Sequence, residues 1–347
     1  MKNKISWIRG YSILFSSFFL VFVAGQLFVS DITLSSISDK YLWRKDLIKK
    51  YNNFKYMIGD RVFANAVIGK DGWLYYTGDM SIQDFQKTSP MNVGNINSIM
   101  SILGRYKERV DRYGGTFLLV IPPDKSTAYP QYMPDEIPVI GQISSLDRLV
   151  ERIGKNHNIQ VLDLRSVLER ASISSQIYYK TDSHWNCQGA YYAYAEIIST
   201  LAVSHPQLRV YSLNDFQIIP SQKSLLDIPS LMGLNLKEDA MVAIPKFDVK
   251  LSTIPVPDGR YAGTSLKTVV NTEKDLPDLM IFHDSFFKAC LDKFIEPTFS
   301  RTISLHYGDI KLADDLALID AEKPNIVIVE FVERQMEYFF RHLSKSN

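Results

Sequence analysis

The chain has 347 residues, of which 46% are hydrophobic and 22% charged, and this is the composition of a folded protein with one large domain or two small ones. Its 39 basic and 38 acidic side chains leave a formal net charge of +1. Composition therefore excludes disordered and fibrous proteins. Because no basic field is available to hold nucleic acid by its phosphates, we expect no nucleic acid partner.

Residues 1–30 depart from this average composition. Three basic side chains near the start precede an uncharged, mostly apolar run from 10 to 30, which as a helix would span about 30 Å, the thickness of a bilayer's hydrocarbon core. We predict a retained anchor in the inner (cytoplasmic) membrane, because the run shows no polar stripe. A cleaved signal peptide is the alternative, since the small residues around Ala24 would suit a cleavage site. The leading basic residues predict a cytoplasmic N-terminus and a remaining chain that is periplasmic, outside the cytoplasm.

A polar lead-in and a hairpin follow the apolar segment. Residues 31–64 mix charges with scattered aromatics, and we expect a largely helical stalk between the membrane and the domain. Residues 67–76 form two short strand-like runs around Lys70-Asp71-Gly72, and the Asp-Gly pair supplies the positive φ that a tight hairpin needs. We therefore predict a β-hairpin at the start of a domain that extends from 65 to 340.

Beyond the hairpin, helical and strand patterns alternate. Apolar residues three and four apart form one helical face from Ile96 to Val110, and the strand-like run at 116–121 is apolar throughout and stops at Pro122. A strand that is apolar on both faces is typical of a parallel sheet covered by helices. The alternation predicts an α/β domain with an open parallel sheet flanked by helices. The further predicted elements are helices at 143–153, 187–201 and 286–294 and strands at 160–164, 279–283 and 325–330.

Residues 204–272 interrupt this alternation, because they contain six prolines and little sustained periodicity. We interpret this stretch as an irregular insertion. A long irregular segment in a compact domain is more often a binding surface or a lid than a plain connection.

The chain has two cysteines, and each lies on the apolar face of a predicted helix. Cys187 shares its face with Tyr194, and Cys290 shares its face with Phe294. We therefore expect both side chains to pack in the core as free thiols. A disulfide is the alternative, because an oxidising compartment would permit one and each cysteine closely follows a candidate site residue.

Asp284-Ser285 is the sharpest candidate for chemistry. The pair lies between the predicted strand at 279–283 and a helix that starts at Phe286. A serine at such a turn exposes its hydroxyl, and the helix N-terminus offers amide donors for a developing negative charge. Ser285 is thus a candidate nucleophile. The alternative is an ordinary N-cap, because serine is common at that position.

Asp182 and His184 supply what a nucleophilic serine lacks. A hydroxyl needs a base to take its proton, and histidine titrates in the right range. In an extended segment residues two apart point to the same side, so Asp182 can fix the tautomer of the His184 ring and stabilise its protonated form. The alternative is a turn carboxylate and a partly buried histidine before a helix capped by Asn186. Because open α/β sheets place their sites at the carboxyl ends of strands, we expect Ser285, His184 and Asp182 to meet as catalytic residues.

A rival arrangement uses some of these residues as metal ligands. Asp182, His184, His283 and Asp284 offer two carboxylates and two imidazoles, which would suit zinc or another divalent ion. Ser285 would then have no role, and neither cysteine is placed as a ligand. We therefore expect no metal and no cofactor.

Two cationic residues are candidates for substrate binding. Lys125 follows the strand at 116–121 and should reach the rim of the site, where it could steer an anionic sugar; a solvated loop lysine is the alternative. Arg334 follows the last predicted strand, together with Glu330 and Glu333, and we expect none of these three to be catalytic.

Five blocks of the sequence, taken in order, resemble the SGNH-hydrolase-like domain of the alginate O-acetyltransferases of the AlgX and AlgJ type. The resemblance runs from about residue 65 to 335 and includes an Asp-x-His pair that precedes the serine, the reverse of ordinary SGNH esterases. His283 departs from it, because a glycine often stands before the Asp-Ser pair. The matching blocks are Gly69-Lys70-Asp71-Gly72-Trp73-Leu74-Tyr75, Pro122-Pro123-Asp124-Lys125 with Tyr129-Pro130, Thr181-Asp182-Ser183-His184-Trp185-Asn186 with Gly189-Ala190, Asp284-Ser285-Phe286, and Pro324-Asn325-Ile326-Val327 with Glu333-Arg334.

The resemblance implies an SGNH-hydrolase-like fold and an O-acetyltransferase that acts on hydroxyls of an exported polysaccharide through an acetyl-serine intermediate. It implies Ser285 as nucleophile, His184 as general base and acid, and Asp182 as the carboxylate that orients it. It also implies a membrane-bound acetyl donor protein of the MBOAT type as a partner. The chain ends soon after the last predicted strand, without a carbohydrate-binding module of the AlgX kind, and this favours an anchored, AlgJ-like protein.

Two other functions stay open at the level of sequence. A carbohydrate esterase or deacetylase would use the same three residues and differ only in passing the acyl group to water. A non-catalytic glycan-binding subunit of a polysaccharide assembly complex would not use them at all.

Overall fold

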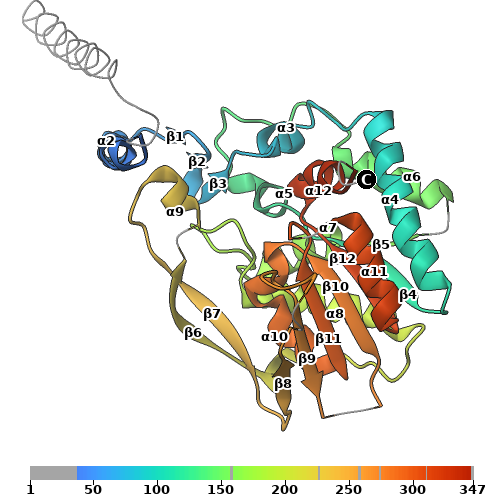
Figure 1. Cartoon of the computed structure of the whole chain (residues 1–347). Coiled ribbons are helices and arrows are strands. Elements are labelled where there is room, and N and C mark those ends of the chain that lie inside the picture. The colour runs from blue at the N-terminus through green and yellow to red at the C-terminus, as the bar shows by residue number, and fades with distance from the viewer. Residues whose placement is uncertain are drawn as a thin grey trace, which may run out of the picture. The chain divides into compact units, whose positions relative to one another are not determined.

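The structure is a computed structural model, and most of the chain is described in it: residues 37–156, 159–225, 227–256, 259–272, 275–309 and 311–344 (Figure 1). The chain divides into two compact units, one that ends at Ile58 and one that begins at Gly59. The predicted anchor at 1–30 lies outside the described residues. Among the described helices, none combines the length and apolar character needed to cross a bilayer.

The first unit contains one described helix, α2 (Ile37–Met57), which occupies most of the expected lead-in. Several of its apolar side chains are exposed, among them Leu47, Tyr51 and Phe54. The lead-in is therefore helical, and its surface is less polar than its charged residues suggest.

A seven-stranded mixed sheet forms the centre of the second unit. Its order is β5-β4-β12-β10-β11-β9-β8. The first five strands run parallel, whereas β9 pairs with β11 and β8 with β9 in antiparallel fashion. The expectation of a purely parallel sheet is therefore wrong at one edge. The strands are β4 (Thr116–Ile121), β5 (Gln160–Asp163), β8 (Leu251–Ile254), β9 (Lys267–Asn271), β10 (Asp278–His283), β11 (Arg301–His306) and β12 (Ile326–Glu330).

Helices cover both faces of the sheet because its central strands carry apolar side chains on both faces. Alternate residues of β10 belong to two different cores: Leu279 packs with helices α7 and α8, and Met280 packs with α4, α6 and α11. This gives three layers (Figure 1). The helices are α4 (Val93–Asp111), α6 (Ser145–Asn156), α7 (Arg165–Ser174), α8 (Cys187–Ala202), α11 (Leu312–Glu322) and α12 (Met336–Ser344).

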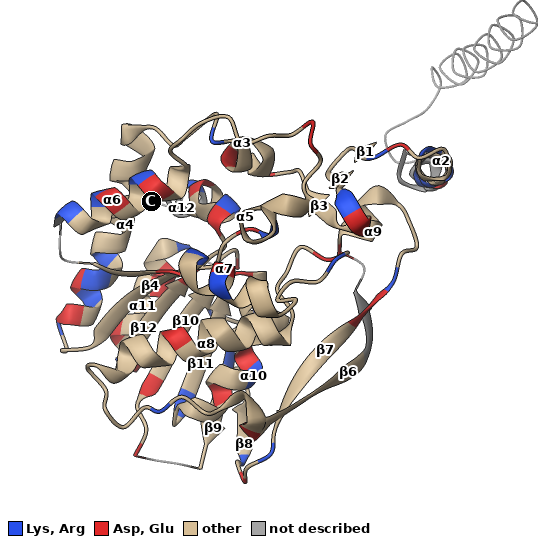
Figure 2. Ribbon diagram, turned by 180° about the vertical axis from the view of Figure 1, so that it is seen from behind, with Lys and Arg blue, Asp and Glu red and all other residues tan. Residues whose placement is uncertain are grey.

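Charged residues of both signs are interspersed along the outer helices, as on α4 and α6, while the strands of the central sheet are mostly uncharged (Figure 2). This distribution suits a formal net charge of +1. The charge pattern therefore provides no extended surface of one sign on these helices.

The predicted hairpin is confirmed. β2 (Ala66–Ile68) pairs antiparallel with β3 (Leu74–Tyr76), and β1 (Val62–Phe63) adds a third strand. Asp71 and Gly72 in the connecting turn have φ of 52° and 77°. The Asp-Gly pair thus supplies the left-handed backbone that the sequence led us to expect.

The helix expected at 286–294 is interrupted. A π-helical turn, Phe287–Leu291, precedes the short helix α10 (Asp292–Ile295), and Cys290 has a φ of 79°. The Trp185 indole Nε1 donates to the carbonyls of Phe286 and Ala289, at 3.1 and 2.9 Å. A contact from a distant segment therefore accompanies the break in the helix.

Residues 204–272 contain more regular structure than their prolines suggested. β6 (Phe216–Leu225) and β7 (Glu238–Pro245) form a two-stranded antiparallel ribbon, with α9 (Asp227–Met232) between them (Figure 1). β8 and β9 extend the main sheet. Pro220 lies where the ribbon's register shifts and Pro245 at its end, which are positions where a strand tolerates proline.

Candidate active site

Ser285 follows β10 at its carboxyl end, and its side chain is exposed. The turn below it is held by Asp284, whose carboxylate accepts from the amides of Phe286 and Val332 at 2.7 and 2.8 Å. The Asp284 amide in turn donates to Glu330 Oε2 at 3.2 Å. Asp284 is therefore a buried anchor that fixes the backbone on which Ser285 stands.

Glu330, at the end of β12, is fully buried beside this anchor. Burial, together with the neighbouring Asp284, raises the pKa of Glu330 well above its usual range. Burial therefore favours the neutral, protonated form of Glu330 beneath the turn.

The structure brings Ser285, His184 and Asp182 into one hydrogen-bonded chain. His184 Nε2 lies 2.7 Å from Ser285 Oγ, and His184 Nδ1 lies 2.6 Å from Asp182 Oδ1. The same Asp182 oxygen accepts from the His184 amide at 3.0 Å. Burial acts to raise the pKa of Asp182, but hydrogen bonds and charge from His184 outweigh it and hold that pKa below its usual value. A carboxylate is thus held against Nδ1, which leaves Nε2 to face the serine.

Lys125 supports the segment that carries this pair, residues 179–184, which we call the base loop. Its Nζ donates to the carbonyls of Tyr179, Lys180 and Asp182 at 3.2, 3.0 and 2.7 Å. Lys125 is 4% exposed, and burial lowers its pKa to about 7. The alternative of a solvated loop lysine is therefore wrong, because the amine is buried and donates to carbonyls of the base loop.

Arg334 is also buried. Its guanidinium pairs with Asp124 and lies over the rings of Tyr76 and Phe286, at 5.3 and 5.7 Å from their centroids. The Phe286 ring also packs against the His184 ring, with 4.9 Å between centroids. Arg334 thus supports the aromatic wall behind the imidazole.

Asp227 and Glu238 are site residues that sequence reasoning missed. Asp227 Oδ2 lies 3.9 Å from His184 Nδ1, and Glu238 accepts from the amide of Thr181 at 2.7 Å. Both come from the stretch at 204–272, in which no spacing or motif singles out an acidic residue. The fold alone brings them to the base loop.

The structure does not bring the four residues of the rival metal site together as ligands. The Asp284 carboxylate is occupied by backbone amides, and His283 Nδ1 lies 2.6 Å from the Asp284 carbonyl. Burial lowers the pKa of His283 to about 3, so its ring is neutral. Asp182, His184 and Asp227 do have ligand atoms within 4.8 Å of one another. However, both His184 ring nitrogens already face Asp182 and Ser285, so this cluster fits a proton relay better than a metal.

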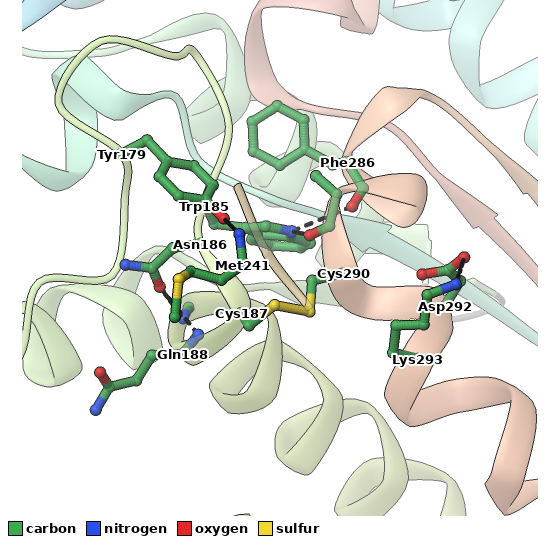
Figure 3. The surroundings of a disulfide bond; sticks show 12 residues. Tyr179, Trp185, Asn186, Cys187, Gln188, Met241, Phe286, Cys290, Asp292 and Lys293 are labelled. Atoms are coloured by element: carbon green, nitrogen blue, oxygen red, sulfur yellow. Dashed lines mark hydrogen bonds and ion pairs between the residues drawn. A yellow bond between two sulfur atoms is a disulfide. The ribbon is translucent and has the colours of Figure 1, made fainter. Parts of the chain in front are cut away.

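The two cysteines form a disulfide, contrary to the expectation of free thiols. The Cys187 and Cys290 sulfurs are 1.98 Å apart and the Cα atoms 5.2 Å apart (Figure 3). The bond joins the first turn of α8, three residues after His184, to the π-helical turn, five residues after Ser285. It therefore links the segment that carries the base to the segment that carries the serine.

Two cavities lie in the second unit. One of about 190 Å³ is lined by residues of α12 and the α3 region (α3, Ser81–Gln86), including Asp84 and Glu337. Another, of about 10 Å³, is lined in part by Lys125 and Ser183. Ser285 lines neither. The hydroxyl thus stands at the surface, which leaves it accessible to a large substrate.

An α/β domain with an exposed serine at a strand end, and an Asp-x-His pair bonded to it, has the architecture of SGNH-hydrolase-like proteins. Among solved structures, Bacillus cereus PatB1 with a sulfonyl adduct superposes with a TM-score of 0.60 at 17% identity, over 80% of this chain and 99% of that chain. A DHHW family protein from Eubacterium siraeum gives 0.58 at 17% identity, over 81% of this chain and 96% of the other. At such identities these likenesses show the fold.

The sequence matches point to a narrower resemblance over part of the chain. Residues 66–222 match the model described as SGNH hydrolase-like domain, acetyltransferase AlgX. A probable alginate O-acetylase AlgJ from Pseudomonas syringae pv. tomato is 25% identical over 141 residues, and one from Azotobacter vinelandii is 26% identical over 136 residues. These stretches cover 41% and 39% of this chain but 34% and 33% of those relatives, so the match spans about a third of their length.

The expected resemblance is therefore confirmed: over residues 66–222 this chain is similar to the SGNH-hydrolase-like domain of the AlgX type, and part of it is similar to AlgJ. The matched family region contains Asp182 and His184 and ends before Ser285. The link between Ser285 and that pair thus rests on the hydrogen bonds described above.

Proposed function

We propose that this chain is an O-acetyltransferase that moves acetyl groups to hydroxyls of an exported polysaccharide through an acetylated Ser285. The observation that carries the proposal is the hydrogen-bonded chain from Ser285 Oγ through His184 to Asp182 at an exposed strand end. In this proposal Ser285 is the nucleophile, His184 the general base and acid, and Asp182 the orienting carboxylate.

In the first half-reaction Ser285 Oγ attacks the carbonyl carbon of an acetyl ester, while its proton passes to His184 Nε2. Asp182 stabilises the imidazolium that forms. When the tetrahedral intermediate collapses, the bond to the donor oxygen breaks, and that oxygen takes the proton from Nε2. The Ser285 amide, at the start of the helical turn, is our candidate donor to the oxyanion.

The second half-reaction reverses these roles. A sugar hydroxyl gives its proton to His184 Nε2 and attacks the acetyl carbon, and Ser285 Oγ leaves with that proton. A carbohydrate esterase would follow the same path with water as the acceptor. Ser285 is exposed and lines neither of the two cavities. This supports a polymer as the acceptor of the acetyl group.

The donor we propose is a membrane-bound protein of the MBOAT type, and the acceptor is an exported glycan, as the names of the AlgJ relatives suggest. Lys125 and Arg334 would act on substrate only indirectly, because both are buried and paired within the chain. Lys125 would hold the base loop, and Arg334 would support the Phe286 ring that packs against His184.

We also propose that the domain works outside the cytoplasm, held at the inner membrane by residues 1–30. The Cys187–Cys290 disulfide supports this location, because disulfides persist in oxidising compartments and are rare in the cytosol.

The test uses the full chain and a chromogenic acetyl ester, with mass spectrometry of the protein after the first turnover. We expect an acetyl group on Ser285 and a burst of product. Ser285→Ala should abolish both, while Ser101→Ala, at an exposed serine of α4, should leave both unchanged. A burst retained in Ser285→Ala, or no acetylation of Ser285 in folded protein, would reject the nucleophile. Addition of an oligosaccharide acceptor then separates acetyl transfer from release of acetate.

A further inference from the structure

Two carboxylates from the stretch between β6 and β7 hold the outer side of the base loop. Glu238, the first residue of β7, accepts from the amides of Lys180 and Thr181 at 3.1 and 2.7 Å and from Thr181 Oγ1 at 2.7 Å. These three bonds fix the loop directly before Asp182.

The second carboxylate belongs to Asp227, the first residue of α9. Its Oδ2 accepts from both the amide and the hydroxyl of Ser183, at 3.2 Å for the amide. Ser183 lies between Asp182 and His184, so Asp227 binds the central residue of the Asp-x-His motif through hydrogen bonds. The same oxygen is 3.9 Å from His184 Nδ1.

Both carboxylates stand at the same end of the β6–β7 ribbon. β6 ends at Leu225 and β7 begins at Glu238, and α9 lies between these ends (Figure 1). The register pairs Leu225 with Glu238. The base loop is therefore held by two carboxylates that come from the same end of the ribbon.

We infer that Asp227 is a positioning residue of the site: it orients the Asp182–His184 turn through Ser183 and adds a second negative charge beside His184 when the ring takes up the serine proton. Glu238 holds the same turn through hydrogen bonds but does not face the His184 ring. This inference rests on the proposed function, because it assigns Asp227 to the proton transfer from Ser285.

The charges around Asp227 favour such a role. During proton transfer the His184 ring becomes a cation, with Asp182 bonded to Nδ1 at 2.6 Å and Asp227 at 3.9 Å. Lys125 and Arg334 are two cations that also interact electrostatically with Asp227. Lys125 donates to carbonyls of the base loop and Arg334 pairs with Asp124. Tyr76 also interacts electrostatically with Asp227, and Glu238 interacts electrostatically with Lys125.

The experiment measures the rate of the acylation burst of the full chain with 4-nitrophenyl acetate between pH 5 and 9. Asp227→Asn keeps the shape and one acceptor but removes the charge. We expect it to slow acylation about tenfold, because the hydrogen bonds from Ser183 lose their charge-assisted strength and the imidazolium loses a nearby negative charge. We also expect the acid limb of the pH–rate profile to move to lower pH, because the imidazolium loses a stabilising neighbour.

Glu238→Gln separates support of the loop from charge at the ring. It should slow acylation without moving the acid limb, because Glu238 contacts the loop before Asp182 and not the imidazole. Asp239→Asn, at the exposed neighbour on β7, removes a charge outside the base loop and should change neither quantity. Thermal unfolding of each variant shows whether it is folded.

The outcomes distinguish this inference from the proposed function. If Ser285→Ala keeps the burst, the proposed function fails. If the burst depends on Ser285 but Asp227→Asn leaves the rate and the acid limb as in the unmodified chain, only the role of Asp227 fails. The same holds if Asp227→Asn and Glu238→Gln slow the burst equally with no movement of the acid limb, since Asp227 would then be a purely structural contact.

Discussion

Reduction of the Cys187–Cys290 disulfide should destabilise the domain strongly. The bond closes a loop with a sequence separation of 103 residues. In the chain-entropy model, a loop of about 100 residues restricts the unfolded chain by about 16 cal/mol/K, which is about 4.7 kcal/mol at 25 °C. Measured effects of native disulfides commonly lie at about 2–5 kcal/mol. We therefore expect the free energy of unfolding to fall by several kcal/mol, a large share of the stability of a typical domain.

The same bond should matter for the geometry of the site. His184 lies three residues before Cys187, and Ser285 lies five residues before Cys290. Their 2.7 Å contact therefore joins two segments that the disulfide also joins. We expect the acylation burst to decline at concentrations of urea below those that unfold the reduced domain, because the two segments can then separate locally.

The assay is urea unfolding with and without a phosphine reductant, followed by tryptophan fluorescence, with thiol counting to confirm full reduction. The double variant Cys187→Ser, Cys290→Ser is the control, because the reductant should have no effect on it. Reduced protein that unfolds within about 1 kcal/mol of the oxidised protein, or a reductant effect that persists in the double variant, would refute the reasoning.

Two further predictions concern buried ionisable groups. Glu330→Gln should change the free energy of unfolding by no more than about 1 kcal/mol, because burial beside Asp284 raises the Glu330 pKa and so favours the neutral acid, which Gln resembles; a loss of several kcal/mol in urea unfolding would contradict this prediction. Lys125→Met should alter the pH dependence of stability: burial lowers the Lys125 pKa to about 7, whereas the unfolded chain binds this proton up to about pH 10.4. The unmodified domain should therefore gain stability relative to Lys125→Met as the pH rises from about 7 to 10, and parallel stability curves would contradict the burial of the amine.

The centre of the fold could be predicted from sequence because its signals are local. The runs that became β4, β10 and β12 each contain four or five consecutive apolar residues, since helices cover both faces of the sheet. The meeting of Ser285 with the Asp182–His184 pair followed from the rule that sites form at the carboxyl ends of strands.

The parts that sequence reasoning missed depend on contacts between distant segments. Lys125 can be buried because its amine donates hydrogen bonds to three carbonyls of the base loop. No local sequence pattern predicts that these acceptors lie beside it. The helix after Ser285 is broken where Trp185 takes two of its carbonyls. The edge strand β8 escaped notice because all four of its residues are exposed, so it lacks the alternation of a half-buried strand.

The position of β12 has a consequence for the order in which this domain can be completed. β12 is the last strand in sequence, yet it lies inside the sheet, paired with β4 on one side and β10 on the other. A growing chain that has not yet produced β12 leaves the inner edges of β4 and β10 open, and open edges invite pairing with other chains. Such a chain already contains Asp182, His184 and Ser285, but its strands β4 and β10 are not yet joined through β12 in one sheet. All three residues precede β12 in the sequence, and the sheet that holds their segments becomes continuous only once β12 has been added.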